Sequence, residues 1–332
     1  MITGPVFGTF TDAYLAVLGS IFADPEFTAA AMGKPAIETT NVSFNIRDPI
    51  NRTAYLAARK ANIVFNHAET LWYLSGSSDL DMIAYYAPAL RKLSPDGKTL
   101  TGTAYGPRLF GPPQGGGSCQ FDRVLNLLRQ DPGSKRAAMM IMRPDELADP
   151  ANPDVACTLA LQFLLRGGRL HLAAYMRGND AVVGLLGDTF AFTMIQEFAA
   201  RLLGVPVGTY AHHVGSMHIN LPDLPKVEAI LADQDRAAFP PSAMPATASW
   251  TDLQTVLGWE RRLRLDQAQF TSDLADVDVY WKEVIGLFEV YRQITHNSGK
   301  LVTRRALAGL RAGHRWLIER RWPSRMPAAV PP

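Results

Sequence analysis

The chain has 332 residues, of which 47% are hydrophobic and 19% charged, so it can form a globular core and lacks the composition of a disordered protein. A net charge of +2 makes no general demand for a nucleic-acid or membrane partner, and no run of 18 or more apolar residues predicts a membrane span. The first residues carry no signal-peptide pattern and two cysteines cannot form a disulfide scaffold, so we expect a cytoplasmic protein.

The first half of the chain alternates helical and extended patterns. Helical spacing of apolar residues and runs of β-branched or apolar residues mark the elements. The expected elements are helices over residues 12–22, 53–74 and 121–128, strands over 41–46 and 137–143, and a flexible glycine-rich loop over 112–118.

The second half contains a hairpin signal, because Gly167 and Gly168 separate two apolar runs. Beyond the hairpin we expect helices over 189–203 and 221–233, a strand over 207–219, a linker rich in proline and alanine over 239–248, and further helices to the end. Strands mixed irregularly with helices, with no phosphate-binding glycine motif, favour an α+β fold over a βαβ nucleotide-binding fold.

Six short segments follow one another along the chain: AETLWYLSGSSD with Glu69, GTAYG with Tyr105, DPGSKRAAMMIMRP with Lys135 and Arg136, ACTLALQF with Cys157 and Gln162, RGNDAVVGLLGD with Arg177, Gly178, Asp180 and Asp188, and HHVGSMHIN with His218 and Asn220. Their order resembles that of the thymidylate synthase family. One segment alone is weak, but six in the family's order are strong. The resemblance implies that family's fold over residues 1–245, a mixed sheet flanked by helices, with a helical extension over 246–332 packed on the same domain.

Some positions depart from thymidylate synthases. Thr158 replaces the histidine after the nucleophile, Asp188 replaces the asparagine of the base signature, and Ser216 replaces an aspartate. These three changes are similar to the phage dCMP hydroxymethylases. Gly178 in place of serine and Asn220 in place of tyrosine depart even from those enzymes. The combination resembles the CMP 5-hydroxymethylases of nucleoside-antibiotic pathways, such as mildiomycin biosynthesis, and so implies 5-hydroxymethylation of CMP.

The resemblance makes Cys157 the nucleophile. Carbon 5 of a pyrimidine becomes reactive when a thiolate adds to carbon 6, and a neighbouring cation lowers the pKa of a thiol. The resemblance places Arg177 beside Cys157, assigns Glu69 to ordering water and relaying protons, and adds Tyr105 to the catalytic group. From the residues alone, Cys157 could instead be an inert core residue and Glu69 a surface residue. Cys119 matches no family position.

Asp188 is expected to read the base. Cytosine presents an acceptor at nitrogen 3 and an amino donor at position 4, and a protonated carboxyl group complements both. The alternative is that Asp188 caps the helix expected to begin there, where aspartate is favoured.

The sugar and phosphate contacts follow from the resemblance. Asn220 would leave space and polar groups for a ribose 2′ hydroxyl, which favours CMP over dCMP; neutral change at a strand end is the alternative. The implied substrate-binding residues are Arg177, Gly178, Gln162, His218 and Asn220, with Lys135 and Arg136 donated by the other subunit of a homodimer. A solvated turn is the alternative for Lys135 and Arg136.

The resemblance also implies 5,10-methylenetetrahydrofolate as co-substrate, contacted by Asp180, and no metal ligands are assigned. The family's tryptophan-rich segment should fall near residues 87–97, which contain no tryptophan. A wetter pocket there favours addition of water over hydride reduction, which is the hydroxymethylase outcome.

The arginine-rich segment 304–325 is expected to be an amphipathic helix that packs Trp316, Leu317 and Trp322 on the core. Nucleic-acid contact is the less favoured interpretation. Three functions compete with CMP hydroxymethylation: dCMP hydroxymethylation, methylation of dUMP, and non-catalytic binding of a nucleotide or RNA.

Overall fold

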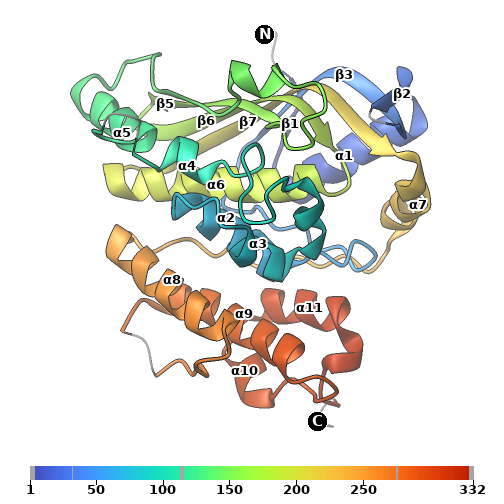
Figure 1. Ribbon diagram of the computed structural model, residues 1–332, viewed down its shortest axis with the longest axis vertical. Coiled ribbons are helices and arrows are strands. Elements are labelled where there is room, and N and C mark those ends of the chain that lie inside the picture. Colours follow the sequence, from blue (N-terminus) through green and yellow to red (C-terminus); the bar gives the residue numbers. More distant parts are fainter. Residues whose placement is uncertain (1–3, 32, 113–115, 274–275, 329–332) are drawn as a thin grey trace.

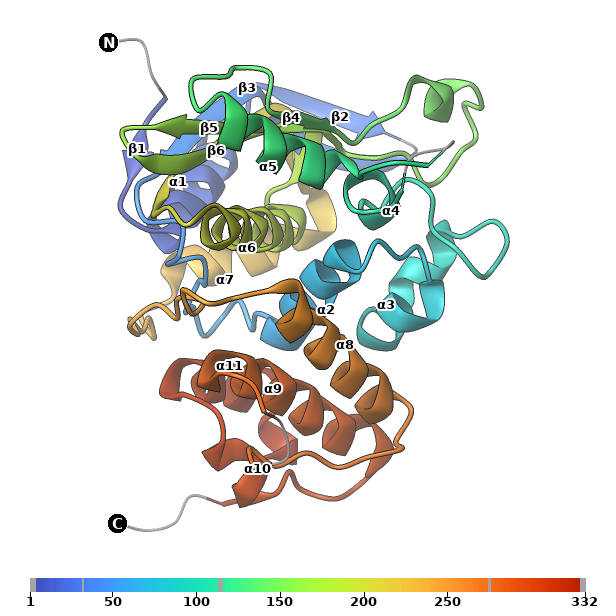
Figure 2. The same cartoon turned by 90° about the vertical axis from the view of Figure 1, so that its left-hand side faces the viewer.

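The computed structural model describes residues 4–31, 33–112, 116–273 and 276–328. A mixed sheet forms one layer, helices pack beneath it, and the C-terminal helices form a further layer on the side away from the sheet (Figure 1; Figure 2). This is the α+β architecture that the sequence predicts. Residues 113–115 of the expected glycine-rich loop lie outside the described ranges.

Seven strands of the described residues form one sheet in the order β1-β3-β7-β6-β5-β4, with β2 paired to β3 off this path. They are β1 (Val6–Phe7), β2 (Phe27–Ala31), β3 (Lys34–Ile46), β4 (Ala138–Met140), β5 (Thr158–Arg166), β6 (Arg169–Asp180) and β7 (Val207–Asn220). The β1–β3 and β6–β7 pairs are parallel and the others antiparallel, so the sheet is mixed. The predicted hairpin is confirmed: Gly167 and Gly168 connect β5 to β6 with φ of 55° and 69°, a conformation that favours glycine.

Helices from the first part of the chain lie between the sheet and the C-terminal helices (Figure 1). The helices that precede the linker are α1 (Phe10–Ala23), α2 (Ile63–Leu74), α3 (Leu80–Tyr86), α4 (Gly106–Leu109), α5 (Gln120–Gln130), α6 (Gly184–Leu203) and α7 (Leu224–Ala232). Short 3₁₀ turns add η1 (Pro88–Leu93), η2 (Pro144–Leu147) and η3 (Leu221–Asp223). Helix α6 packs against β6, β7 and α2, so most of its residues are buried.

Helix α2 begins ten residues later than predicted. Residues 53–62 form an irregular segment that pairs with the chain after α7: the Ala58 amide donates to the Asp233 carboxylate at 2.7 Å, and Leu56 bridges to Arg236. The helix starts only after Asn62, whose side chain accepts a hydrogen bond from the Phe65 amide. The predicted start at residue 53 is therefore wrong, because tertiary pairing overrides the apolar spacing of this segment.

Helix α6 begins five residues earlier than predicted, at Gly184. Asp188 lies in the second turn, so the interpretation of Asp188 as a helix N-cap is wrong. A Cβ at Gly184 would collide with the side-chain oxygen of Asn179, so glycine is required where the chain leaves β6 for the helix.

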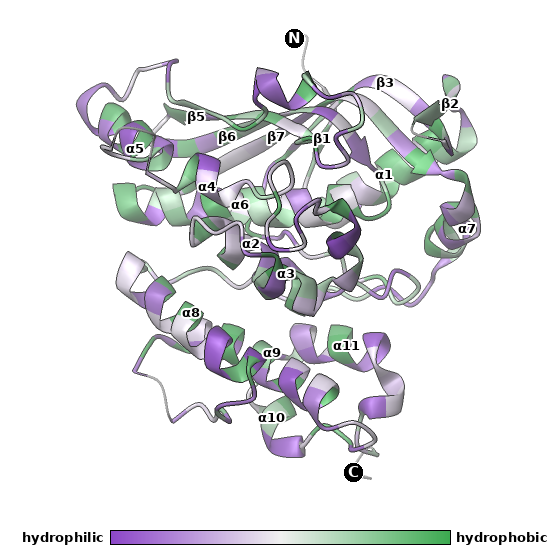
Figure 3. Cartoon of the chain, in the orientation of Figure 1, coloured by the Kyte–Doolittle hydropathy of each residue, from purple (hydrophilic) through white to green (hydrophobic). Residues whose placement is uncertain are grey.

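The C-terminal helices are α8 (Trp250–Arg264), α9 (Val279–His296), α10 (Arg304–Ala308) and α11 (Ala312–Arg321), followed by the turn η4 (Pro323–Arg325). Helices α9 and α11 contact α2, and α8 contacts α3. Hydrophobic and hydrophilic residues alternate along these helices (Figure 3). No helix among the described residues is both long and apolar enough to cross a membrane.

The basic segment 304–325 forms two short helices and a turn, not the single amphipathic helix expected. Gly309 ends α10, and the chain turns before α11. Leu317 is buried, while Trp316 and Trp322 pack partly buried against the core, as predicted. The Arg320 guanidinium stacks 3.7 Å above the Trp316 ring, so part of the basic surface is bound to the protein itself.

Candidate active site

Cys157 and Arg177 lie side by side where β5 begins and β6 ends. The Arg177 amide donates to the Cys157 carbonyl at 2.9 Å, and its guanidinium lies 3.7 Å from the Cys157 sulfur. The same guanidinium donates to the carbonyls of Ala156 at 2.9 Å and Val155 at 3.0 Å, which holds it in place. The predicted neighbourhood of thiol and cation is present.

The pKa of Cys157 is raised overall, although Arg177 lowers it as expected. Burial raises it above the usual value of a thiol, Arg177 lowers it, and the carboxyl groups of Asp188 and Asp154 raise it further. The net direction is upward, so Arg177 reduces the cost of the thiolate without overcoming burial. Without a substrate, Cys157 is therefore a protonated thiol near neutral pH.

Tyr105 lies against the start of β5, next to Cys157. The Thr158 hydroxyl donates to the Tyr105 hydroxyl at 3.2 Å, and the Tyr105 ring stacks on Tyr73 with 4.9 Å between centroids. Both tyrosines are buried, and burial raises the pKa of each well above its usual range, so both stay protonated. Thr158, which replaces a histidine of the resembling family, thus serves to hold Tyr105.

Asp154 joins the two loops that carry Tyr105 and Cys157. Its buried carboxylate accepts hydrogen bonds from the amides of Thr101, Gly102 and Thr103 at 2.7, 2.8 and 2.7 Å, and from the Thr103 hydroxyl at 2.6 Å. A carboxylate that accepts several amide donors holds a loop firmly. Sequence reasoning missed this residue, because an aspartate in a loop carries no signal of which loop it will bind.

Two carboxyl groups, Glu69 on α2 and Asp188 on α6, face each other across the site. Gly187 makes room for them, since a Cβ there would lie 3.2 Å from a Glu69 oxygen. Burial, and then the Asp188 charge, raise the pKa of Glu69 to about 8, against the lowering effect of a hydrogen bond from Tyr73. Burial raises the pKa of Asp188 to about 7. Both groups can therefore hold or release a proton near neutral pH.

Behind Asp188 lies a chain of polar side chains that the sequence analysis missed. Asn179 donates a hydrogen bond to Asp188, which lowers the pKa of that carboxyl against the larger effect of burial. The Asn179 amide nitrogen is 3.2 Å from His212 Nε2, and His212 Nδ1 is 2.7 Å from the Tyr210 hydroxyl. Burial lowers the pKa of His212 to about 3, so the ring is neutral and its Nε2 accepts from Asn179. The pattern HH in the β7 segment was the available signal.

Asp180 and Asn220 meet at the far end of the site. One Asp180 oxygen accepts from the amides of Val182 and Val183 at 2.7 and 2.9 Å, and the other accepts from the Asn220 amide at 2.8 Å. His218 pairs with Asp180 in the β6–β7 register. Gly178 pairs with Ser216 two positions earlier in the same register. These four residues, like Arg177, thus lie at one end of the parallel strand pair.

Gln162, Lys135 and Arg136 form a separate group beside β4. The Gln162 amide donates to the Lys135 carbonyl at 2.8 Å, and its oxygen accepts from the Tyr175 hydroxyl at 3.3 Å. Lys135 and Arg136 are exposed. The substrate roles given to Gln162, Lys135 and Arg136 stay predictions.

The family model for thymidylate synthase matches residues 12–256, which is most of the chain, and the chain belongs to the thymidylate synthase family. A thermostable thymidylate synthase A from Bacillus subtilis has a similar fold, with a TM-score of 0.56 and 22% identity over 70% of this chain and 86% of that one.

Two similar curated proteins are named hydroxymethyltransferases. The deoxyuridylate hydroxymethyltransferase of Bacillus phage SP01 is 33% identical over 229 residues, covering 64% of this chain and 57% of the relative. The deoxyuridylate hydroxymethyltransferase of Delftia phage PhiW-14 is 31% identical over 190 residues, covering 54% of this chain and 51% of the relative. The chain thus spans about half the length of the curated relatives it matches.

Proposed function

We propose that this protein transfers a hydroxymethyl group to carbon 5 of a pyrimidine nucleotide, with CMP as substrate and methylenetetrahydrofolate as one-carbon donor. Membership of the thymidylate synthase family and the names of the phage relatives support hydroxymethyl transfer. The resemblance to CMP 5-hydroxymethylases of antibiotic pathways is part of this proposal. The observation that carries the choice of cytosine is Asp188, a partly exposed carboxyl beside Cys157 with a pKa of about 7.

In the proposed reaction, Cys157 attacks carbon 6 of the base and carbon 5 then attacks the one-carbon donor. The bound folate supplies the carbon at the oxidation level of formaldehyde. Because the pKa of Cys157 is raised in the free protein, thiolate formation needs a proton acceptor nearby. Glu69, which accepts a hydrogen bond from Tyr73, provides a carboxyl group that exchanges protons near pH 8. Carbon 5 then loses its proton to a base as the bond between the new carbon and the folate nitrogen breaks, which leaves an exocyclic methylene on the base. Water adds its hydroxyl group to this methylene and gives up a proton, and Cys157 leaves as the double bond between carbons 5 and 6 forms again.

Asp188 fits cytosine through its proton. When protonated, one oxygen donates to nitrogen 3 and the other accepts from the amino group at position 4. Asn179 donates to this carboxyl and is itself fixed by His212, so the orientation of Asp188 is set from behind. A proton shared with nitrogen 3 also draws electrons from the ring and assists the attack of Cys157.

The sugar and phosphate contacts are proposed as the sequence implies them. His218 and Asn220 would meet the ribose, and Arg177 the phosphate. Lys135 and Arg136 are exposed in the single chain, as basic residues that serve a second subunit must be. Asp180 keeps the capacity to contact folate, because a carboxylate has about four acceptor positions and the chain occupies three of them.

A second candidate is hydroxymethylation of dUMP, which the printed names of the two phage relatives favour. A competition assay separates the two. Equal amounts of CMP, dCMP and dUMP are incubated with the protein, with and without methylenetetrahydrofolate, and products are identified by mass spectrometry. Folate-dependent addition of a hydroxymethyl group mainly to CMP supports the proposal. Product mainly from dUMP would overturn the role of Asp188 as a cytosine reader, and product mainly from dCMP would overturn the role of Asn220.

A further inference from the structure

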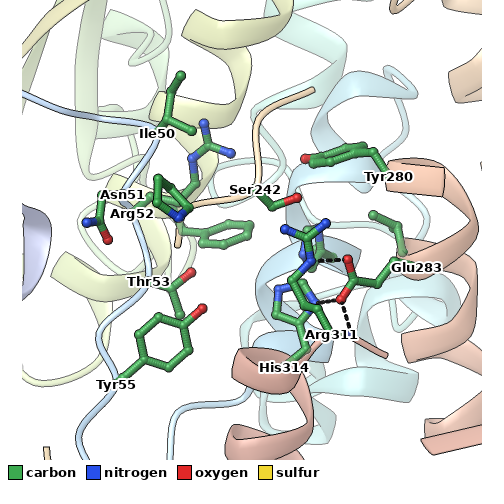
Figure 4. Close-up of a pocket in the computed structure, with 14 residues that line it drawn as sticks. Ile50, Asn51, Arg52, Thr53, Tyr55, Ser242, Tyr280, Glu283, Arg311 and His314 are labelled. Atoms are coloured by element: carbon green, nitrogen blue, oxygen red, sulfur yellow. Dashed lines mark hydrogen bonds and ion pairs between the residues drawn. The ribbon is translucent and has the colours of Figure 1, made fainter. Parts of the chain in front are cut away.

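A polar cavity lies between α2 and α6, which carry Glu69 and Asp188, and the C-terminal helices α9 and α11 (Figure 4). Its volume is about 30 Å³, which is room for two or three water molecules at about 10–15 Å³ each. Helix α2, the segment before it, the linker, α9 and α11 all contribute to its wall. The polar side chains that matter here are Arg52, His67, Ser242, Tyr280, Arg311 and His314.

Two buried polar side chains in this wall have no hydrogen-bond partner within the described part of the chain. They are His67, with both ring nitrogens unpaired, and Tyr280, with its hydroxyl unpaired. The two residues are only 3% and 5% exposed. An unpaired buried polar group costs about 1–3 kcal/mol, so two such residues facing one cavity indicate an occupant that satisfies them.

Two guanidinium groups face the cavity, and each is paired with a carboxylate. Arg52 donates through Nε to the Thr193 hydroxyl at 3.1 Å and is paired with Glu197 at 2.5 Å. Its remaining terminal nitrogen makes no hydrogen bond within the described chain. On the opposite wall, Arg311 and His314 both contact Glu283 (Figure 4).

The field at His67 is positive. After burial, three neighbours lower the pKa of His67, namely His314, Arg52 and Arg311. Arg52 and Arg311 carry positive charge beside this ring, while at Tyr280 the same two guanidinium groups are opposed by the carboxylates of Glu197 and Glu283. The Glu283 carboxylate is already bound by the Arg311 amide at 2.8 Å, by the Arg311 side chain and by His314 at 2.9 Å. The Glu283 carboxylate thus has few acceptor positions left for a further donor.

We propose that this cavity binds a small oxyanion, for which inorganic phosphate is the probe. Guanidinium groups and hydroxyl donors are the groups that hold a tetrahedral oxyanion. The volume excludes a nucleotide, and the described residues contain no group of three or more His, Cys, Asp or Glu side chains arranged for a metal ion. The anion accepts from the Tyr280 hydroxyl and from the unpaired nitrogen of Arg52, and it ties α9 and α11 to α2.

This site is separate from the candidate active site. His67 and Glu69 are two residues apart on α2, and two residues on a helix point to nearly opposite sides. The same spacing separates Phe190, which lines the cavity, from Asp188 on α6. The anion therefore binds on the reverse side of the two helices that carry the catalytic carboxyl groups, and the proposal does not depend on the proposed function.

The test compares the melting temperature of the full chain in phosphate and in chloride at equal ionic strength. The informative variant is Tyr280→Phe, which removes only the unpaired hydroxyl. In chloride we expect it to melt at the wild-type temperature or above, because a buried unpaired group is lost. In phosphate we expect the wild-type protein to gain stability through binding, and Tyr280→Phe to lose more than half of that gain. The matched control is Tyr85→Phe on α3, whose hydroxyl contacts Thr295 of α9 at 2.5 Å outside the cavity lining, and which should keep the full gain.

Phosphate also has affinity for a nucleotide site, so the gain is measured again in Arg177→Gln, which should keep it. His67→Asn provides a second variant at the cavity and should lose the gain like Tyr280→Phe. Glycerol 2-phosphate distinguishes a free ion from a phosphate group on a larger molecule, and no gain is expected from it. An equal gain in the wild type and in Tyr280→Phe, or no gain in the wild type, would overturn the proposal.

Discussion

The Asn220 side chain donates a 2.8 Å hydrogen bond to Asp180, so the residue expected at the sugar holds the residue expected at the folate. The sequence gives these positions separate roles. Because they share one hydrogen bond, a change at Asn220 should affect both substrates of the proposed reaction.

The first prediction concerns Asn220→Ala. We expect the preference for CMP over dCMP to fall toward one and KM for the folate to rise about tenfold or more, since a hydrogen bond to a carboxylate contributes about 1.5–3 kcal/mol. Steady-state kinetics with each substrate varied in turn provides the measurement. A variant that changes neither the nucleotide preference nor the folate KM would show that this hydrogen bond serves only the fold.

The second prediction concerns Asp188→Asn. An asparagine amide can pair with cytosine or, turned over, with uracil, but it has no acidic proton to share with nitrogen 3, so CMP turnover should fall. A hydrogen bond to a charged group contributes about 1.5–3 kcal/mol, which is about 10- to 150-fold. Turnover of uracil nucleotides should rise at the same time. The control is Asp273→Asn on the exposed surface, and unchanged activity toward both bases would rule out Asp188 as base reader.

The third prediction concerns Asn179→Leu. The Asn179 hydrogen bond lowers the pKa of Asp188, so its loss should raise that pKa. The proposed reaction on CMP needs protonated Asp188, and the decline of kcat/KM at high pH should therefore move to higher pH, while kcat falls. A pH profile between 5.5 and about 9.5 tests this, because a purely structural defect lowers activity at every pH without moving the limb.

The fourth prediction concerns the thiol. Burial raises the pKa of Cys157 and Arg177 opposes that rise. In a Cys119→Ser background, where Cys157 is the one remaining cysteine of the chain, alkylation by iodoacetamide should be slow at pH 7 and accelerate with rising pH. Adding Arg177→Gln should move this acceleration to still higher pH. Fast alkylation at pH 7, or the same profile with and without Arg177, would contradict the assigned environment.

The fifth prediction concerns stability and pH. The folded-state pKa of Glu69 is about 8, above the ordinary value of 4.5, so the native state binds a proton that the unfolded state has lost between these values. The stability associated with this proton is complete below about pH 4.5 and is lost as pH rises through about 8. In urea unfolding at several pH values, Glu69→Gln should lose less stability than the wild type over this window. Glu228→Gln, at an exposed position of α7, is the control and should follow the wild type.

Much of the fold could be predicted because its signals are local. The hairpin needed glycines at positive φ, and two glycines stand there; α1, α5 and β7 follow apolar periodicity over their whole lengths. The start of α2 could not be predicted, because residues 53–62 pair with residues after α7 far along the chain. Apolar spacing says nothing about such a partner.

In the candidate site, too, some residues could be predicted from the sequence and others could not. The order of motifs led to Cys157, Arg177, Glu69 and Asp188, which the fold brings together. Asn179 and His212 were missed, because a hydrogen bond between neighbouring parallel strands depends on register. The lowering effect of Arg177 on the pKa of Cys157 was predicted, but the net rise was not, because a sequence shows which cation is near and not how much water the fold removes.

The clamp formed by Asp154 restricts how this protein can be altered. Gly102 approaches the backbone of Asp154 so closely that a Cβ there would overlap its carbonyl group. Any side chain at position 102 would push apart the loops that hold Tyr105 and Cys157, although it would touch neither of them. A library designed to change nucleotide preference should therefore vary Asn220 and Asp188 and leave position 102 fixed, since substitution there would lower the yield of active variants whichever nucleotide was sought.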